Sequence, residues 1–163
     1  MRNVLFVCLG NICRSPTAEG VFQHMLEQTG LTSRIRVDSA GTGAWHVGKA
    51  PDSRAQKAAY ERGYRLSHLK ARQVAVADFD KFDLILAMDR SNMDDLLEMC
   101  PPDKQNKIRL FMDFAENRRF PEVPDPYYAG SKGFELVLDL VEDASKGLLN
   151  YLQVNIAGRA ATD

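Results

Sequence analysis

VLFVCLGNICRSP, residues 4–16, contains the pattern from which the rest of the fold can be worked out. Its first four residues form a continuous apolar run, which is typical of a strand buried on both faces of a parallel sheet. Gly10 and Asn11 tolerate the left-handed backbone of a tight loop, and Pro16 suits the first turn of a helix. The stretch therefore predicts a strand, a loop and a helix, with the loop at the carboxyl edge of the sheet.

Beyond this stretch, strand patterns alternate with helix patterns along the chain. The first helix is expected to run to about Gln28, because Gly30 suits its end. Further strands are expected at residues 34–39, 83–88 and 107–112. Further helices are expected at residues 53–62, 92–99 and 134–152, with a loop over residues 118–129. This βαβαβαβ order, closed by a long helix, predicts one doubly wound α/β sheet with a final covering helix.

The composition fits one compact domain, with 163 residues of which 45% are hydrophobic and 26% charged. Residues 1–155 are expected to form this domain, and residues 156–163, which show no periodicity, are expected to fray as a tail. The formal net charge of -1 argues against a chain that coats nucleic acid or an anionic membrane, because those partners favour clustered basic residues. Any anion site must therefore be local.

The three cysteines do not suggest a disulfide scaffold, because their number is odd and two of them share one short loop. Reduced thiols that serve chemistry or packing are expected instead. The sequence also has no apolar run of membrane-spanning length and no secretory pattern at its start. The expected compartment is therefore the cytoplasm.

The loop from Cys8 to Arg14 carries the groups that phosphoryl transfer to a thiol requires. Its backbone N–H groups can curl into an anion nest, and the helix that begins near Ser15 adds its positive end, which favours a thiolate at Cys8. Arg14 offers a planar fork for two phosphoryl oxygens, and Ser15 can donate its hydroxyl to the sulfur. A cysteine at the end of a strand is also often a small packed residue, so the spacing by itself leaves both interpretations open.

The segment from Val7 to Pro16 with Ala18-Glu19, together with Asp125-Pro126-Tyr127-Tyr128, resembles the low-molecular-weight protein tyrosine phosphatases. The resemblance spans about residues 2–153. It implies a phosphatase-I-like four-stranded parallel sheet in the order 2-1-3-4 with helices on both faces. It also implies hydrolysis of phosphotyrosine and other aryl phosphate monoesters through a phosphocysteine intermediate, with no metal or organic cofactor.

Carried over by position, the family's nucleophile falls on Cys8, its phosphate-binding arginine on Arg14 and its general acid and base on Asp125. Pro124 and Pro126 would stiffen the loop that presents Asp125, and an acid there would protonate the departing phenolate. Without the resemblance, Asp125 would equally be a turn residue. The resemblance implies a phosphate-binding loop made of Cys8, Leu9, Gly10, Asn11, Ile12, Cys13, Arg14 and Ser15.

The resemblance also implies residues that support the loop and residues that line the cleft. Asn11, Ser15, Ser39 and His68 fall where the family has a hydrogen-bonded network, although a solvated histidine and a strand-end serine are the ordinary interpretations of two of them. Asp89 would hold Arg14 and would also suit a helix cap. The aromatic cleft that selects phosphotyrosine over the shorter phosphoserine is expected to be lined by Leu9, Trp45, Tyr127 and Tyr128.

Cys13 is a candidate redox partner of Cys8, because a nearby thiol can capture an oxidised nucleophile as a disulfide; the alternative is a packed residue. Cys100 is interpreted as packing. The partners implied are tyrosine-phosphorylated proteins, a cognate tyrosine kinase among them, with no nucleic acid, no membrane, and a monomer or weak self-association.

Three alternatives remain open beside the phosphatase. Thiol-linked arsenate reductases share the loop but need further cysteines after the third strand, where only Cys100 is present. Arginine phosphatases resemble a pattern with threonine directly after the nucleophile, where this chain has Leu9. A silent phosphotyrosine-binding module would be expected to lack Cys8 or Asp125.

Overall fold

The computed structural model of the protein describes residues 1–117 and 119–162, with side chains described as far as residue 155. Four strands form one all-parallel sheet in the order β2-β1-β3-β4. The strands are β1 (Arg2–Cys8), β2 (Ile35–Gly41), β3 (Leu84–Ala87) and β4 (Ile108–Leu110). The predicted single α/β domain with strand order 2-1-3-4 is therefore confirmed.

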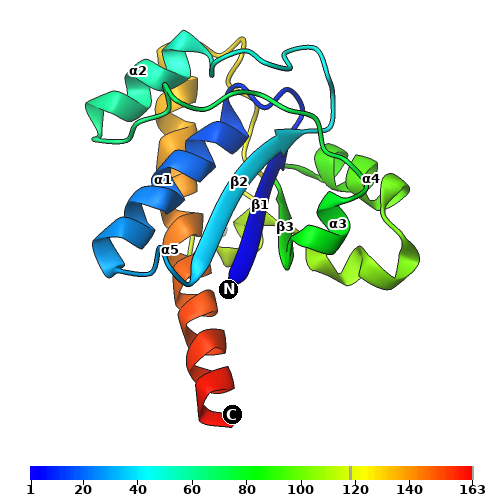
Figure 1. The fold of residues 1–163 in the computed structure, drawn as a ribbon. Helices are drawn as coiled ribbons and strands as arrows, with labels where there is room; N and C mark the ends of the chain where they lie inside the picture. The colour runs from blue at the N-terminus through cyan, green and yellow to red at the C-terminus, as the bar shows by residue number, and fades with distance from the viewer. Residues whose placement is uncertain (118, 163) are drawn as a thin grey trace.

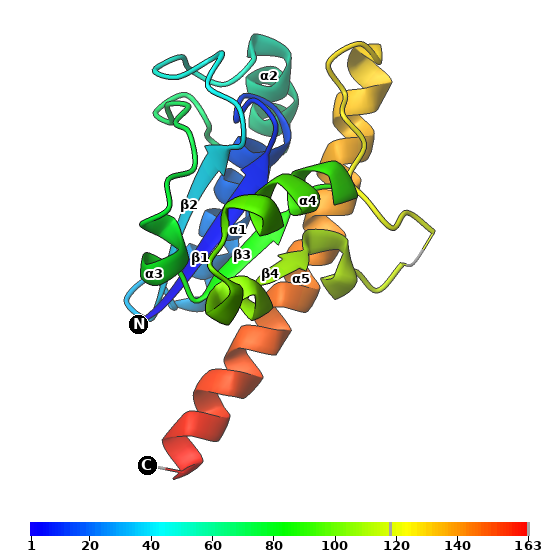
Figure 2. The same ribbon diagram turned by 90° about the vertical axis from the view of Figure 1, so that its right-hand side faces the viewer.

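Helices cover both faces of the sheet (Figures 1 and 2). On one side lie α1 (Arg14–Thr29), α2 (Ser53–Glu61) and α5 (Gly130–Thr162). On the other side lie α3 (Asp78–Lys81) and α4 (Arg90–Met99). This arrangement puts the start of α1 and the ends of the central strands at one edge of the sheet, as a doubly wound fold does.

The apolar run of β1 is buried because its side chains alternate between two separate cores. Val4 and Phe6 belong to the larger core with residues of α1 and α5 such as Phe22 and Val141. Leu5 and Val7 belong to the smaller core, which includes residues of α3 and α4 such as Phe79 and Leu96. A strand with apolar residues at every position is thus required at the centre of this sheet.

The structure differs from the sequence-based expectation mainly at short elements. The strand expected over residues 107–112 is only Ile108–Leu110, and Phe111–Phe114 forms a 3-10 helix, η2. Phe111 and Met112 are still buried, so the apolar residues that suggested a longer strand pack into the core from a turn instead. The short α3 and the 3-10 helix η1 (Pro102–Lys107) were not expected.

The final helix is longer than expected. Its backbone runs from Gly130 to Thr162 and projects beyond the sheet at its C-terminal end (Figure 1). The tail expected at residues 156–163 lies outside the residues whose side chains are described, and its fraying stays a prediction. Within the described part of the chain, no helix combines the length and apolar character needed to cross a membrane.

Candidate active site

The phosphate-loop candidate connects the last residue of β1, Cys8, to the first residue of α1, Arg14. Asn11 adopts the left-handed conformation with φ 57°, as the sequence suggested. Gly10 has a different reason to lack a side chain, since a Cβ there would lie 3.0 Å from Cδ2 of His46. The loop therefore curls tightly at the positive end of α1.

The thiol of Cys8 is buried, at 3% exposure, and is surrounded by hydrogen-bond donors. Its Sγ atom lies 3.0 Å from Oγ of Ser15, and the backbone N–H of Asn11 donates to it over 3.3 Å. These donors and the end of the α1 dipole all favour negative charge on the sulfur. The arrangement suits a thiolate nucleophile.

A chain of polar side chains supports the loop from behind. The amide of Asn11 donates to Oγ of Ser15 over 2.8 Å and to Oγ of Ser39 over 3.0 Å. Ser39 in turn donates to Oε1 of Glu19 over 2.6 Å, and the backbone N–H of Arg72 donates to Oδ1 of Asn11 over 3.0 Å. Glu19 and Arg72 are members that sequence reasoning did not assign to this network, although Glu19 was part of the motif.

The structure places His68 outside this network. Its side chain is exposed, and among the described residues it makes no hydrogen bond to Asn11 or Ser39. It lines a cavity of about 220 Å³ that also contains Glu19 and His24. Asn11 and Ser39 are contacted instead by the backbone N–H of Arg72 and the carboxyl of Glu19, respectively.

Burial makes Glu19 an unusual carboxyl. Desolvation raises its pKa to about 7, against the hydrogen bond from Ser39, which lowers it. The Glu19 carboxyl is therefore partly protonated near neutral pH. It lies behind the phosphate loop and is not a member of it.

Arg14 is buried at 3% exposure and held by two oxygen atoms. Its Nη1 atom donates to Oδ2 of Asp89 over 2.6 Å and to the carbonyl of Val123 over 3.0 Å. Burial alone would lower the pKa of Arg14, but Cys8 and the hydrogen bond to Asp89 raise it above its ordinary value. Asp89 also caps α4 by accepting from the N–H of Asn92 over 2.7 Å, so one carboxylate both fixes the guanidinium and starts a helix.

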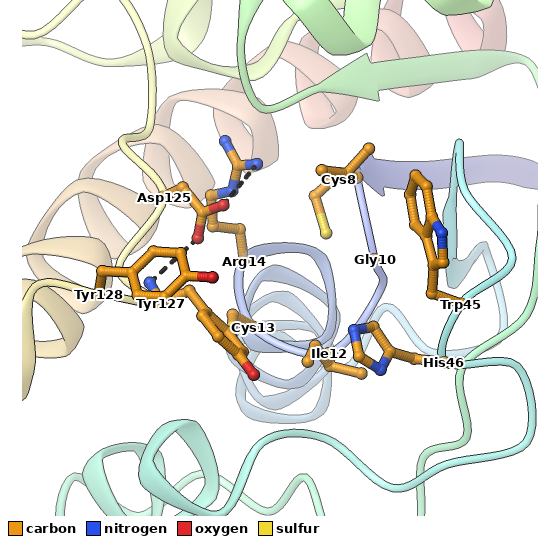
Figure 3. A pocket seen from close by; sticks show the side chains of 11 residues that line it. Cys8, Gly10, Ile12, Cys13, Arg14, Trp45, His46, Asp125, Tyr127 and Tyr128 are labelled. Atoms are coloured by element: carbon orange, nitrogen blue, oxygen red, sulfur yellow. Dashed lines mark hydrogen bonds and ion pairs between the residues drawn. The ribbon is translucent and has the colours of Figure 1, made fainter.

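Asp125 lies in the loop between η2 and α5, with a side chain that is 52% exposed. Its Oδ2 atom is 3.9 Å from Nη2 of Arg14, and its Oδ1 atom accepts from the N–H of Tyr127 over 3.1 Å. Figure 3 shows the carboxylate beside the guanidinium, across the cavity from the sulfur. An acid in this place can reach a group attached to a phosphate held by the loop.

These groups surround a cavity of about 270 Å³. Tyr127 and Tyr128 form one wall, with ring centroids 4.9 Å apart in an edge-to-face pair, and Trp45 and His46 lie on the opposite side (Figure 3). Leu9 also lines the cavity. His46 is a cavity residue that the sequence reasoning missed, and its place directly after Trp45 is the signal that could have found it.

The other two cysteines differ in their surroundings. Cys13 is buried and lines the same cavity as Cys8, and both are free thiols. Burial, followed by the charge of Asp52, raises the pKa of Cys13 to about 12, so this thiol is neutral at pH 7. Cys100 ends α4 and packs in the smaller core.

Comparison with known proteins gives one consistent family. The family model described as low molecular weight phosphotyrosine protein phosphatase matches residues 3–157. A low molecular weight protein-tyrosine-phosphatase of Streptomyces coelicolor is 43% identical over 161 residues, covering 97% of this chain and 98% of that protein. The crystal structure of a protein tyrosine phosphatase from Entamoeba histolytica superimposes with a TM-score of 0.92 at 44% identity, covering 95% of this chain and 99% of that one.

The same fold is also found with another stated activity. A structure of an arginine phosphatase from Drosophila superimposes with a TM-score of 0.86 at 33% identity, covering 93% of this chain and 98% of that one. The fold alone therefore does not separate phosphotyrosine from phosphoarginine as substrate.

Proposed function

Because the chain belongs to the low molecular weight phosphotyrosine protein phosphatase family, and is thus a protein-tyrosine phosphatase, we propose that Cys8 is its nucleophile and Asp125 its general acid and base. The observation that carries this proposal is the cavity in which the sulfur, the Arg14 fork and the Asp125 carboxylate converge. The substrates are phosphotyrosine-containing proteins.

In the first step, the Cys8 thiolate attacks the phosphorus of the bound phosphoester. The loop N–H groups and Arg14 bind the phosphoryl oxygens and stabilise the charge that develops on them. The bond from phosphorus to the tyrosine oxygen breaks, and Asp125 donates its proton to that oxygen, so that tyrosine leaves neutral. The product on the enzyme is a phosphocysteine.

In the second step, Asp125 is ionised and takes a proton from water, which attacks the phosphocysteine. The bond from phosphorus to sulfur breaks, inorganic phosphate leaves, and Cys8 returns to the thiolate. Ser15 supports this departure, because a thiolate can only accept, so the Ser15 hydroxyl, which accepts from Asn11, donates its hydrogen to the sulfur. The same carboxyl thus serves as acid and then as base.

Selection of an aryl phosphate follows from the walls of the cavity. The rings of Tyr127, Tyr128 and Trp45 offer faces and edges for a phenyl ring whose phosphate reaches the loop. A phosphoserine side chain is too short to reach the loop while it contacts these walls. Leu9 after the nucleophile, where arginine phosphatases are expected to carry threonine, favours the aryl ester over phosphoguanidinium.

We further propose that the enzyme acts in the cytoplasm as a monomer or with weak self-association, and that a tyrosine kinase is among its substrates. The need to keep the thiols of Cys8 and Cys13 reduced supports this compartment. The low net charge supports a protein substrate rather than nucleic acid or a membrane surface.

The test compares hydrolysis of an aryl phosphate, a phosphotyrosine peptide and phosphoarginine, with arsenate reduction measured alongside. The Cys8→Ser variant should abolish all activity, and phosphotyrosine and aryl phosphate should dominate in the parent. Dominant turnover of phosphoarginine or arsenate would contradict the proposal.

We also propose that Cys13 protects Cys8 from oxidation. Peroxide converts the Cys8 thiolate to a sulfenic acid, the Cys13 thiol attacks that sulfur, and a disulfide forms as water leaves. A dithiol reductant should then restore activity in the parent and in Cys100→Ser, but less completely in Cys13→Ser. Equal recovery in Cys13→Ser would remove the protective role.

A further inference from the structure

Arg54, in the first turn of α2, lies between the phosphate loop and the loop that carries Asp125. Its Nη1 atom donates to the carbonyl of Tyr127 over 2.9 Å. Its Cζ atom lies 5.2 Å from the ring centroid of Tyr127 and 4.9 Å from that of Phe134 at the start of α5. The guanidinium of Arg54 thus contacts both the main chain and the ring of Tyr127, which forms part of the cavity wall.

The other edge of the same guanidinium is fixed to Asp52. Nε donates to Oδ1 of Asp52 over 3.1 Å, and Nη2 donates to Oδ2 over 3.0 Å, which is a two-point contact between planar groups. The side-chain hydrogen bond from Arg54 lowers the pKa of Asp52, so the carboxylate stays ionised. The backbone N–H of Asp52 donates to the carbonyl of Ile12 over 2.8 Å, and Ile12 belongs to the phosphate loop.

These contacts form one continuous path between the two catalytic loops. It runs from the carbonyl of Ile12 to Asp52, from Asp52 to Arg54, and from Arg54 to the carbonyl of Tyr127. The N–H of Tyr127 then donates to Oδ1 of Asp125 over 3.1 Å. The path joins segments that are 73 positions apart in the sequence at the Arg54–Tyr127 bond.

From this path we propose that Arg54 is a positioning residue, which sets the distance and orientation of Asp125 relative to the phosphate held above Cys8. The inference rests on the proposed role of Asp125. With a side chain that is 46% exposed, Arg54 gains little stability from its ion pair with Asp52, since water screens exposed pairs and ordering two side chains offsets their attraction. Its contacts therefore matter for geometry more than for folding.

The alternative is that Arg54 only anchors α2 or attracts the anionic substrate. Either effect would lower the rate for all substrates alike, because neither depends on how much the leaving group needs a proton. Loss of a well-placed acid has a different signature: it slows substrates with a poor leaving group most. The parameter kcat/KM reports on this step, since it covers everything up to departure of the phenol.

The test therefore measures kcat/KM for a series of aryl phosphates from 4-nitrophenyl phosphate to phenyl phosphate in Arg54→Met, Arg54→Lys and Asp125→Asn. In Arg54→Met, phenyl phosphate should lose about tenfold more than 4-nitrophenyl phosphate, because a small displacement of a catalytic group costs of this order. Arg54→Lys keeps the charge but not the planar two-point contact, so it should show the same dependence on the leaving group.

Arg62→Met is the matched control, because Arg62 caps the other end of α2 and pairs with carboxylates of α5 instead of the loops. It should show no dependence on the leaving group. An equal loss for all aryl phosphates in both Arg54 variants, or no loss, would overturn the inference. If Arg54→Met does not fold, Arg54→Lys is judged by the same criterion. If Asp125→Asn itself shows no such dependence, the proposed function fails, whereas a dependence in Asp125→Asn alone rejects only the role of Arg54.

Discussion

Asn11 is the residue on which the hydrogen bonds of the phosphate loop converge. Its amide gives one hydrogen to Ser15 and one to Ser39, while its carbonyl oxygen accepts from the backbone of Arg72. Both serine hydroxyls accept from Asn11, and Ser39 donates its own hydrogen to Glu19, while the hydrogen of Ser15 can go to a thiolate at Cys8 or to the carbonyl of Ala40, 3.5 Å away. A single amide group thus ties both serines and the backbone of Arg72 to the loop.

Removal of the Asn11 side chain should slow turnover about tenfold, the usual cost of losing a supporting hydrogen-bonded group. Asn11→Gly is the suitable variant, since alanine would add strain at the left-handed φ of 57°. His68→Ala should have a smaller effect on kcat, because His68 is exposed and outside the network. Steady-state kinetics with an aryl phosphate measures kcat of both variants. A loss of kcat in His68→Ala as large as that in Asn11→Gly would contradict the placement of His68 outside the network.

Glu19 should make the stability of the protein depend on pH. Burial raises its pKa from the ordinary 4.5 to about 7, so the folded state keeps a proton that the unfolded chain has already released. The free energy of unfolding contributed by this group should therefore be greatest below about pH 4.5 and fall as the pH rises to about 7.

The comparison with Glu19→Gln isolates this contribution, because glutamine stays neutral at every pH and can still accept from Ser39. Urea unfolding across the same pH range should show the variant gaining stability relative to the parent as the pH rises. A constant difference between the two proteins would mean that Glu19 titrates as an ordinary carboxyl.

Among the secondary-structure elements, the end of β2 supports the phosphate loop from behind. Gly41 pairs with Cys8 across the two strands, and the N–H of Gly43 donates to the carbonyl of Leu9 over 2.9 Å. A Cβ at Gly41 would lie 2.7 Å from that carbonyl and 3.2 Å from the backbone nitrogen of Asn11. The end of β2 thus leaves no room for a side chain at Gly41, and the phosphate loop packs directly on the backbone of β2.

Gly41→Ala should therefore displace the loop, lower the free energy of unfolding by about 1–3 kcal/mol and weaken competitive inhibition by inorganic phosphate. Gly30→Ala is the control, because Gly30 ends α1 with φ 71° and a methyl group there would meet no described atom within 4 Å. It should cost stability through backbone strain and leave phosphate inhibition unchanged. Unaltered phosphate inhibition in Gly41→Ala would show that the loop tolerates the added group.

Across the molecule as a whole, a cluster of charges joins the C-terminal end of α2 to α5. Arg62 pairs with Glu135, Asp139 and Glu142 of α5, and the Tyr64 hydroxyl donates to Glu142 over 2.6 Å. Desolvation and the bond to Glu142 raise the pKa of Tyr64 to about 12, so the hydroxyl remains a donor. The cluster therefore holds the C-terminal end of α2, opposite the turn that carries Arg54.

Arg62→Met should lower the free energy of unfolding by about 1 kcal/mol, because it leaves three carboxylates close together without their cation, and water already screens these partly exposed groups. Thermal unfolding followed by circular dichroism measures the change, and added salt should reduce it by screening the carboxylates. A melting temperature equal to that of the parent would mean that the cluster contributes no net stability.

Much of the fold of this protein could be predicted from local sequence patterns. The strand, loop and helix at residues 4–16 were predictable because an apolar run, a residue that tolerates positive φ and a helix-starting proline act over a few positions. The resemblance to a known family then suggested Asp125, and the structure brings it to 3.9 Å from Arg14. The short β4 was overestimated, because burial of Phe111 and Met112 does not distinguish a strand from a 3-10 turn.

The order of the elements can be read from the chain alone, because it depends on neighbouring residues, and the residue types of the phosphate loop suggest its chemistry. Tertiary packing was needed to show that Glu19 and Arg72, rather than His68, complete the network behind Asn11, and that Arg54 links the phosphate loop to the loop that carries Asp125. Such contacts join residues tens of positions apart, and they depend on how helices pack on the twisted sheet. No local pattern carries that information, so only the packed molecule shows which of several polar side chains reaches the site.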